Sequence, residues 1–332
     1  MTTLAANEPQ LVSRIEEVGA KIQKVRDTTA NIIFGQERVI DLALITLLSG
    51  GHALLIGVPG LAKTSLVETL GTVLGLQNKR IQFTPDLMPS DIVGSEVLEE
   101  STGGRRSFRF VEGPIFTQLL MADEINRASP KTQSALLQAM QEHHVTVAGT
   151  RHDVPRPFHV LATQNPLEQE GTYPLPEAQL DRFLLQIDVS YPDAAAERRM
   201  LFATTGVEDR KLKTILSAEE LMVAQRLVRQ LPVGDQVVDA ILKLVRSARP
   251  GTGIDQELDD MIAWGPGPRA SQALMLAVRA KAMMDGRLAP SIDDVIELAE
   301  PVLKHRMALT FAARSEGVEM SDMVAKLVEP LG

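Results

Sequence analysis

The chain has 332 residues, which is enough for one large domain and a smaller one. Its composition, 44% hydrophobic and 23% charged, is that of a folded protein and argues against a largely disordered chain. The absence of cysteine excludes disulfides, thiolate metal sites and cysteine nucleophiles from this chain. The formal net charge of −9 disfavours general nucleic-acid binding, because proteins of that class are more often basic.

The N-terminal segments predict helices and no membrane span. Residues 1–10 lack the basic and apolar regions of a secretory signal. The apolar stretch 39–56 is divided by Gly50-Gly51-His52, and each part is shorter than a spanning helix requires. Helical spacing of apolar residues predicts an amphipathic helix over 11–28, and we expect a second helix after Gly35. We therefore expect a soluble, cytoplasmic protein.

Short apolar runs bounded by turns recur through the first half of the chain. They lie at 53–56, 81–83, 119–122, 160–162 and 183–189. Helical stretches such as 130–142 separate several of them. Buried strands that alternate with helices indicate a mostly parallel sheet that is covered on both faces, and hence an α/β fold.

The pattern changes after residue 192, where apolar residues follow helical spacing and no convincing strand is found. Ser217 with Glu220, and Ser291 with Asp294, are typical of capping boxes at helix starts. We therefore predict an α/β domain over residues 1–204 and a helical domain over 205–332.

A glycine-rich loop runs from Gly57 to Thr64, between an apolar strand and a helix expected over 64–74. This context is typical of a phosphate-binding loop, whose N–H groups curl around phosphate oxygens at a helix N-terminus. Lys63 would reach the β- and γ-phosphates, and Thr64 would bind Mg²⁺. The residue before the lysine is usually glycine and is Ala62 here, which is tolerable if the backbone is helical. The alternative is a strand-to-helix turn that binds no ligand.

Two carboxylates, Asp123 and Glu124, follow the apolar run 119–122. Strand ends at one edge of a parallel sheet face the ligand crevice. Asp123 would hold magnesium, directly or through water, and Glu124 would polarise the attacking water, which are the two tasks that phosphoryl transfer requires. An Asp-Glu pair alone is more often a helix cap or a solvated turn. The loop and the pair together, about 60 residues apart in this order, predict hydrolysis of a nucleoside triphosphate.

Further motifs carry a resemblance to a known family. They are Phe34-Gly35-Gln36, Gly113-Pro114-Ile115-Phe116, ADEINRA at 122–128, KTQSALL at 131–137, ATQNP at 162–166 and EGTYPLPEAQLDRF at 170–183. With these motifs the chain resembles the MoxR family of AAA+ ATPases, most strongly over residues 35–190 and more weakly at 267–270 and 303–306. The resemblance implies a P-loop core built on a mostly parallel five-stranded sheet flanked by helices, followed by a C-terminal all-α lid domain.

The resemblance also assigns catalytic roles beside that of Glu124. It implies that Asn165 is sensor 1, Arg182 the arginine finger and Arg269 sensor 2, with the last acting either in its own subunit or across a subunit interface. From the residues alone, Asn165 would be a turn residue, and Arg182 would pair with Asp181 or Glu177.

The expected cofactors are ATP and Mg²⁺, the metal being held by Thr64 and Asp123. The residues expected to contact them are Gly35, Gln36, Gly57, Val58, Pro59, Gly60, Leu61, Ala62, Lys63, Thr64, Ser65 and Asp123.

Two insertions also fit the family. Residues 85–112 lie where it carries a hairpin-like helix-2 insert, and Arg105, Arg106 and Arg109 are expected to make the tip basic, the alternative being a solvated loop. Residues 143–156 resemble the hairpin that precedes sensor 1.

The leading functional hypothesis is a ring-forming, probable hexameric ATPase that acts as a chaperone-like remodeller. The resemblance implies a von Willebrand factor A-domain partner, and the client is not readable. A nucleic-acid motor is the alternative, opposed by the net acidity and by the 4% content of aromatic residues available for base stacking. The ATPase subunit of a metal chelatase is a third possibility. A non-hydrolysing switch is disfavoured, because Glu124 and Arg182 are both present.

Overall fold

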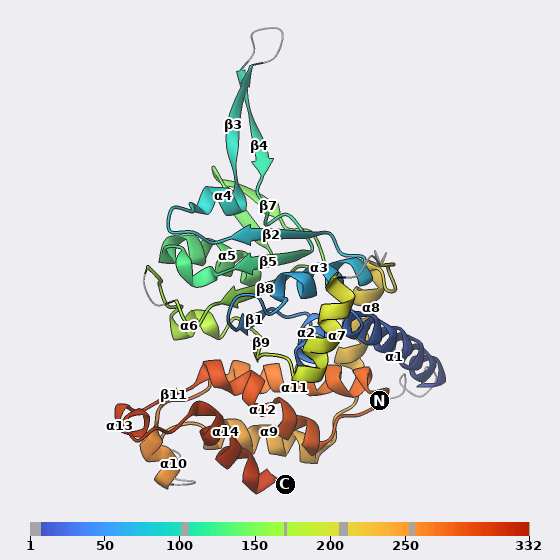
Figure 1. Cartoon of the computed structure of the whole chain (residues 1–332), viewed down its shortest axis with the longest axis vertical. Coiled ribbons are helices and arrows are strands. Elements are labelled where there is room, and N and C mark those ends of the chain that lie inside the picture. Colours follow the sequence, from blue (N-terminus) through green and yellow to red (C-terminus); the bar gives the residue numbers. More distant parts are fainter. Residues whose placement is uncertain (1–7, 101–105, 169–170, 206–211, 252–255, 332) are drawn as a thin grey trace.

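The computed structural model describes residues 8–100, 106–168, 171–205, 212–251 and 256–331. A central sheet with its flanking helices forms the middle of the molecule (Figure 1). A thin hairpin projects from one end, and a helical domain forms the other.

The sheet has five parallel strands, as expected. In spatial order they are β2 (Asn78–Gln82), β5 (Leu119–Asp123), β8 (His159–Gln164), β1 (Ala53–Ile56) and β9 (Leu185–Asp188). Alternate residues divide between two apolar cores, with Leu119 and Met121 facing one and Leu120 and Ala122 facing the other. Because both faces are covered, the strands are nearly continuous apolar runs, which is why the sequence indicates them.

The helices within residues 8–205 surround this sheet, and several of them cover its two faces. They are α1 (Glu8–Ala30), α2 (Glu37–Ser49), α3 (Lys63–Val73), α4 (Pro89–Val93), η1 (Ile125–Arg127), α5 (Pro130–Glu142), α6 (Glu177–Leu180) and α7 (Ala194–Thr205). Buried residues of α2 and α3 belong to one core, and those of α5 belong to the other.

Both expected insertions are antiparallel hairpins. One joins β3 (Gly94–Glu100) to β4 (Arg106–Glu112), and the other joins β6 (His144–Val147) to β7 (Thr150–Asp153). The first projects away from the body (Figure 1). It is therefore a paired β-ribbon for its described length, not a loop.

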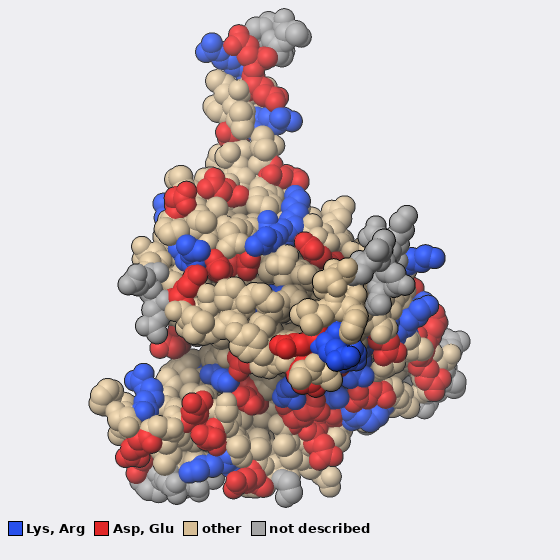
Figure 2. Space-filling model, viewed as in Figure 1, with Lys and Arg blue, Asp and Glu red and all other residues tan. Residues whose placement is uncertain are grey.

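The expected basic tip is not found in the described part of the first hairpin. Arg105 lies outside the described residues. Arg106 lies 3.6 Å from a Glu100 oxygen and Arg109 lies 2.8 Å from a Glu99 oxygen, so cross-strand carboxylates neutralise both arginines. Figure 2 shows acidic and basic residues interspersed along the ribbon. The sequence shows the arginines, but it does not show the register between β3 and β4 that places glutamates beside them.

The helical domain carries α8 (Ala218–Gln230), α9 (Asp235–Ser247), α10 (Gln256–Met261), α11 (Pro268–Met284), α12 (Ile292–Leu303), η2 (Lys304–Arg306), α13 (Phe311–Ser315), α14 (Met320–Val328) and η3 (Glu329–Leu331). Both predicted capping boxes are present, at the starts of α8 and α12. A short ribbon of β10 (Ile262–Trp264) with β11 (Ala308–Leu309) was not expected, because strands this short carry no readable period. The boundary at 204/205 stays a prediction, since residues 206–211 lie outside the described ranges. Within those ranges, no helix combines the length and apolar character that a bilayer crossing requires.

A buried arginine of η2 joins the two domains. Arg306 is 2% exposed and donates to Asp181 Oδ1 at 2.8 Å, and also to the carbonyl oxygens of Phe183 (2.6 Å), Leu184 (3.1 Å) and Val302 (2.5 Å). A buried guanidinium needs this degree of pairing to offset its desolvation. The segment that precedes β9 is thereby fixed to the helical domain.

Replacing Arg306 with alanine is expected to lower the free energy of unfolding by about 3–5 kcal/mol, because Asp181 and the carbonyl oxygens lose a buried partner. Urea unfolding followed by circular dichroism measures this. Arg314→Ala, at an exposed position of α13, is the matched control and should change stability by less than about 0.5 kcal/mol. Equal effects of the two substitutions would contradict the role of Arg306.

Two neutral histidines lie where β1 and β8 begin. His52 accepts from Val160 N–H at 2.9 Å and donates to Met140 O at 3.2 Å, while His159 donates to Gly51 O at 2.8 Å. Burial lowers the pKa of His52 to about 3 and that of His159 to about 4. Each ring uses one nitrogen as donor and is therefore held in a single neutral tautomer.

The free energy of unfolding is therefore expected to decrease as the pH is lowered from about 6.5 towards 4. The unfolded chain binds a proton at each ring below about pH 6.5 and the folded chain does not, so stability is lost as pH drops from there towards 4. Urea titrations at several pH values should show a slope that is smaller in His159→Gln by about 1 kcal/mol per pH unit. Thr146→Ser, an exposed substitution on β6 that involves no ionisable group, is the control and should keep the wild-type slope. An unchanged slope in His159→Gln would contradict the assignment.

Candidate active site

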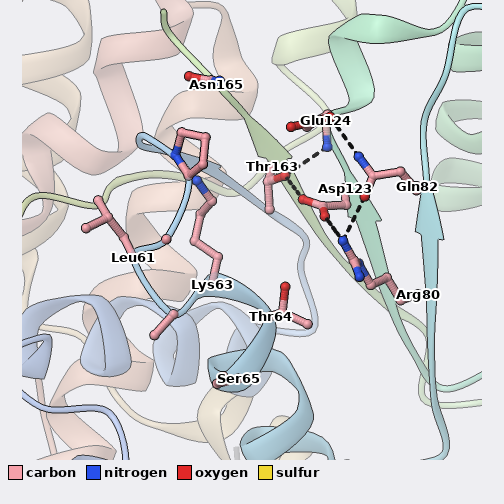
Figure 3. Close-up of a pocket in the computed structure, with 13 residues that line it drawn as sticks. Leu61, Lys63, Thr64, Ser65, Arg80, Gln82, Asp123, Glu124, Thr163 and Asn165 are labelled. Atoms are coloured by element: carbon pink, nitrogen blue, oxygen red, sulfur yellow. Dashed lines mark hydrogen bonds and ion pairs between the residues drawn. The ribbon is translucent and has the colours of Figure 1, made fainter. Parts of the chain in front are cut away.

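The glycine-rich loop connects β1 to α3 and forms one wall of a cavity of about 410 Å³. The loop leaves no room for a side chain at Gly57, where an added Cβ would lie 2.6 Å from Val189 O. Lys63 is the first residue of α3 and donates to Gly57 O at 2.5 Å and to Val58 O at 3.0 Å. The cavity is lined by Pro59, Gly60, Leu61, Ala62, Lys63, Thr64, Ser65, Arg80, Gln82, Asp123, Glu124, Thr163 and Asn165 (Figure 3).

Ala62 departs from the helical backbone under which its methyl group was expected to be tolerated. Its φ of 56° and ψ of 20° are left-handed. The loop enters α3 through this left-handed residue, and glycine adopts that conformation without steric cost. For alanine the conformation costs about 1–2 kcal/mol, so this turn is strained in the folded protein.

Asp123 ends β5 and is hydrogen-bonded through both carboxylate oxygens. Oδ1 accepts from the Thr163 hydroxyl at 2.5 Å, and Oδ2 accepts from Arg80 Nη2 at 2.6 Å and Nε at 3.2 Å. Thr163 comes from β8 and Arg80 from β2, the two strands that flank β5 (Figure 3). Asp123 is thus fixed from both sides at the carboxyl end of the sheet.

Glu124 follows in a left-handed conformation, with φ 54° and ψ 51°. Its N–H donates to the Thr163 hydroxyl at 2.9 Å, and its Oε2 accepts from Gln82 Nε2 at 2.7 Å and from Arg127 Nη1 at 3.1 Å. The turn separates its carboxylate from that of Asp123, so the two acids have different partners.

Arg80, Gln82, Thr163 and Arg127 were not identified from the sequence. Arg80 and Gln82 alternate with the buried Ile81, and this period of two places them on one face of a strand that adjoins the acidic strand. That alternation was a usable signal, but only once the order of strands was known.

Asn165 follows β8 and lines the same cavity. Its side chain is buried, and its Oδ1 accepts from Leu167 N–H at 3.1 Å. Asn165 therefore stabilises a turn, as the residues alone suggested, and also lines the cavity, as the family resemblance implied.

The cavity is lined by groups of opposite charge, with Lys63 on one side and Asp123 and Glu124 on the other. Burial lowers the pKa of the Lys63 ammonium, and attraction by Asp123 and Glu124 opposes that shift. Because the carboxylates face the loop across the cavity, a bound anion would meet Lys63 and the loop N–H groups, and a cation would meet Asp123.

The expected arginine finger and sensor 2 lie elsewhere. Arg182 and Arg269 line a separate depression of about 220 Å³ with Met140, Gln141 and Asp181. Arg269 Nη1 lies 3.5 Å from Asp181 Oδ2, while Arg182 has no ion pair with Asp181 or Glu177 among the described residues. The depression lies where β9 begins, whereas the glycine-rich loop follows the carboxyl end of β1.

Gly35 and Gln36 also lie outside the lining of the loop cavity. Gln36 donates to Ser190 O at 2.7 Å, and a Cβ added to Gly35 would lie 2.5 Å from the Ala196 methyl group. Both residues pack against the segment that leads into α7, so their contact with nucleotide stays a prediction.

Comparison with known proteins agrees with this geometry. A family model described as the ATPase family associated with various cellular activities (AAA) matches residues 52–185, and an AAA lid domain matches 255–327. Chaperone MoxR1 of Mycobacterium tuberculosis is 42% identical, covering 90% of this chain and 78% of that protein. Protein MoxR of Paracoccus denitrificans is 31% identical, covering 90% and 91%.

A solved protein of Cytophaga hutchinsonii, provisionally described as an ATPase, superposes with a TM-score of 0.89 at 34% identity, covering 98% of both chains. The similarity to MoxR proteins extends over 90% of the chain and includes the sheet, the glycine-rich loop and the acidic strand end. The chain belongs to the MoxR family of AAA+ ATPases.

Proposed function

We propose that this chain hydrolyses ATP as one subunit of a ring, and that it uses the energy to remodel partner proteins. One observation carries the proposal. The loop residues Lys63 and Thr64, which follow β1, face Asp123 and Glu124 at the end of β5 across a single cavity, and β8 lies between the two strands. Positioning and charge stabilisation are what phosphoryl transfer requires of a protein.

Each residue of the cavity has a role that suits its surroundings. Lys63 and the loop N–H groups would bind the phosphates. The Thr64 hydroxyl and the Asp123 carboxylate are hard oxygen donors of the kind that Mg²⁺ prefers, and the ion would neutralise phosphate charge. Glu124 would polarise the attacking water, and Asn165 would orient it.

The second half of the site would come from a neighbouring subunit. Arg182 and Arg269 share a depression that excludes the loop of their own chain. The Nε atom of Arg182 is buried and has no hydrogen-bond partner within the described part of the chain, as for a group whose acceptor lies on another molecule. We propose that both arginines stabilise phosphates bound by the adjacent subunit, which for Arg269 favours action across the interface. A head-to-tail contact of this kind closes into a ring, and the family resemblance suggests six subunits.

The remodelling role draws on the relatives, one of which is named a chaperone. A cytoplasmic location, a von Willebrand factor A-domain partner and a lid beginning near residue 205 belong to the same proposal. A nucleic-acid motor is less well supported, because Arg106 and Arg109 of the projecting hairpin are paired with glutamates. No feature of the described residues favours a metal chelatase over the remodeller.

Glu124→Gln is expected to bind ATP with near wild-type affinity but to hydrolyse it at least about a hundredfold more slowly, since the amide cannot accept a proton from water. Phosphate release measures turnover, and a fluorescent ATP analogue measures binding. Glu316→Gln, at an exposed position beyond α13, is the matched control and should be fully active. Wild-type turnover in Glu124→Gln would remove this residue from the mechanism.

Arg182→Ala and Lys63→Ala are each expected to be inactive alone and to recover turnover when mixed. The hybrid interface joins an intact loop to an intact arginine, and random mixing gives on the order of a quarter of the wild-type rate. Phosphate release is measured across mixing ratios. Lys63→Ala mixed with Glu124→Gln is the control, because both defects lie in the same half of the site and no interface there is complete. Absence of recovery in the first mixture at every ratio would exclude an arginine that acts across the interface.

A further inference from the structure

A chain of hydrogen bonds links the two acidic residues of the cavity through strand β2. Arg80 Nη2 donates to Asp123 Oδ2 at 2.6 Å and to Gln82 Oε1 at 2.7 Å, and Gln82 Nε2 donates to Glu124 Oε2 at 2.7 Å. Figure 3 shows Arg80 and Gln82 side by side on one strand, facing the acids at the end of the next. The two carboxylates are thus connected through a single guanidinium and a single amide.

The guanidinium lies against the carboxylate that is expected to hold the metal. Asp123 Oδ1 is already hydrogen-bonded to the Thr163 hydroxyl at 2.5 Å, which leaves Oδ2 as the atom that Arg80 contacts. Two cations cannot share this oxygen without strong repulsion at such separations. Direct coordination of a metal by Oδ2 would therefore require the guanidinium of Arg80 to move away.

The position of Arg80 allows that movement. Its side chain is 50% exposed, whereas that of Asp123 is 13% exposed. Strand β2 is the edge strand of the sheet, so no further strand covers its outer side. An arginine with half of its surface in water can leave one carboxylate at small cost, because exposed ion pairs are weak.

Arg80 also determines which way the Gln82 amide points. The amide oxygen accepts from Arg80, so the amide nitrogen is the group that is left to face Glu124. If Arg80 leaves, nothing on β2 holds this orientation, and Gln82 is no longer fixed as a donor to Glu124. A change at Asp123 is thereby transmitted to Glu124.

We propose that Arg80 is a positioning residue that acts as the resident counter-ion of Asp123. The metal–nucleotide complex must displace it from Oδ2. The proposal rests on the ATPase function proposed above. It makes Arg80 a competitor of the metal, so its removal should help metal binding although it removes a side chain from the cavity.

The test measures the free Mg²⁺ concentration that gives half-maximal binding of a fluorescent, non-hydrolysable ATP analogue. In Arg80→Gln this concentration is expected to fall about threefold to tenfold, the range for losing a charge-assisted pair. Arg80→Lys keeps a cation and should stay within about twofold of wild type. Lys79→Gln, an exposed neighbour on the other face of β2, is the matched control for charge and should have no effect.

A second variant makes the test independent of how Arg80→Gln folds. Gln82→Leu removes the other acceptor of Arg80 and should lower the half-maximal Mg²⁺ concentration by about twofold, in the same direction. An unchanged or increased Mg²⁺ requirement in both variants would overturn the proposal. So would weaker binding of the analogue to Arg80→Gln in EDTA, because that result would make Arg80 a phosphate ligand. If wild type binds no analogue at any Mg²⁺ concentration, the proposed ATPase function itself fails.

Discussion

The parallel register of the sheet is the constraint on which the rest of the structure depends. Gln82 lies opposite Asp123, Ala122 opposite Ala162, and Ile56 opposite Gln164, so four strands end at nearly the same level. Polar residues at these strand ends, or just beyond them, therefore lie close together at one edge of the sheet. A shift of one residue in any pair would turn the polar side chains to the opposite face.

The candidate site residues are divided between the two ends of the strands. The glycine-rich loop and the acids lie at the carboxyl ends, while Arg182 and Arg269 line a separate depression where β9 begins. Asp181 is paired with Arg306 and Arg269, and Arg182 has no carboxylate partner among the described residues. The two groups lie apart within one chain, and this separation supports the proposal that a neighbouring subunit completes the site.

Local patterns predicted much of the fold and the loop half of the site. The strand, the glycine-rich loop and α3 are contiguous, so residues 53–73 reveal them directly, and both capping boxes are contained within four residues. Side-chain contacts between neighbouring strands could not be predicted from the sequence. The pairing of Arg80 with Asp123, and of Arg109 with Glu99, depends on strand order and register that the sequence does not display. The left-handed Ala62 follows from how the loop enters α3 and not from any propensity of alanine.

The link between Arg306 and the segment before β9 has a mechanical consequence. Because a buried guanidinium ties η2 to the carbonyl oxygens of Phe183 and Leu184, the lid and the base of the arginine half are coupled as one body. In a ring, a tilt of one subunit's lid would then carry its own arginines towards or away from the nucleotide of the next subunit. In the proposed ring, the orientation of each lid would then affect when the adjacent subunit hydrolyses ATP.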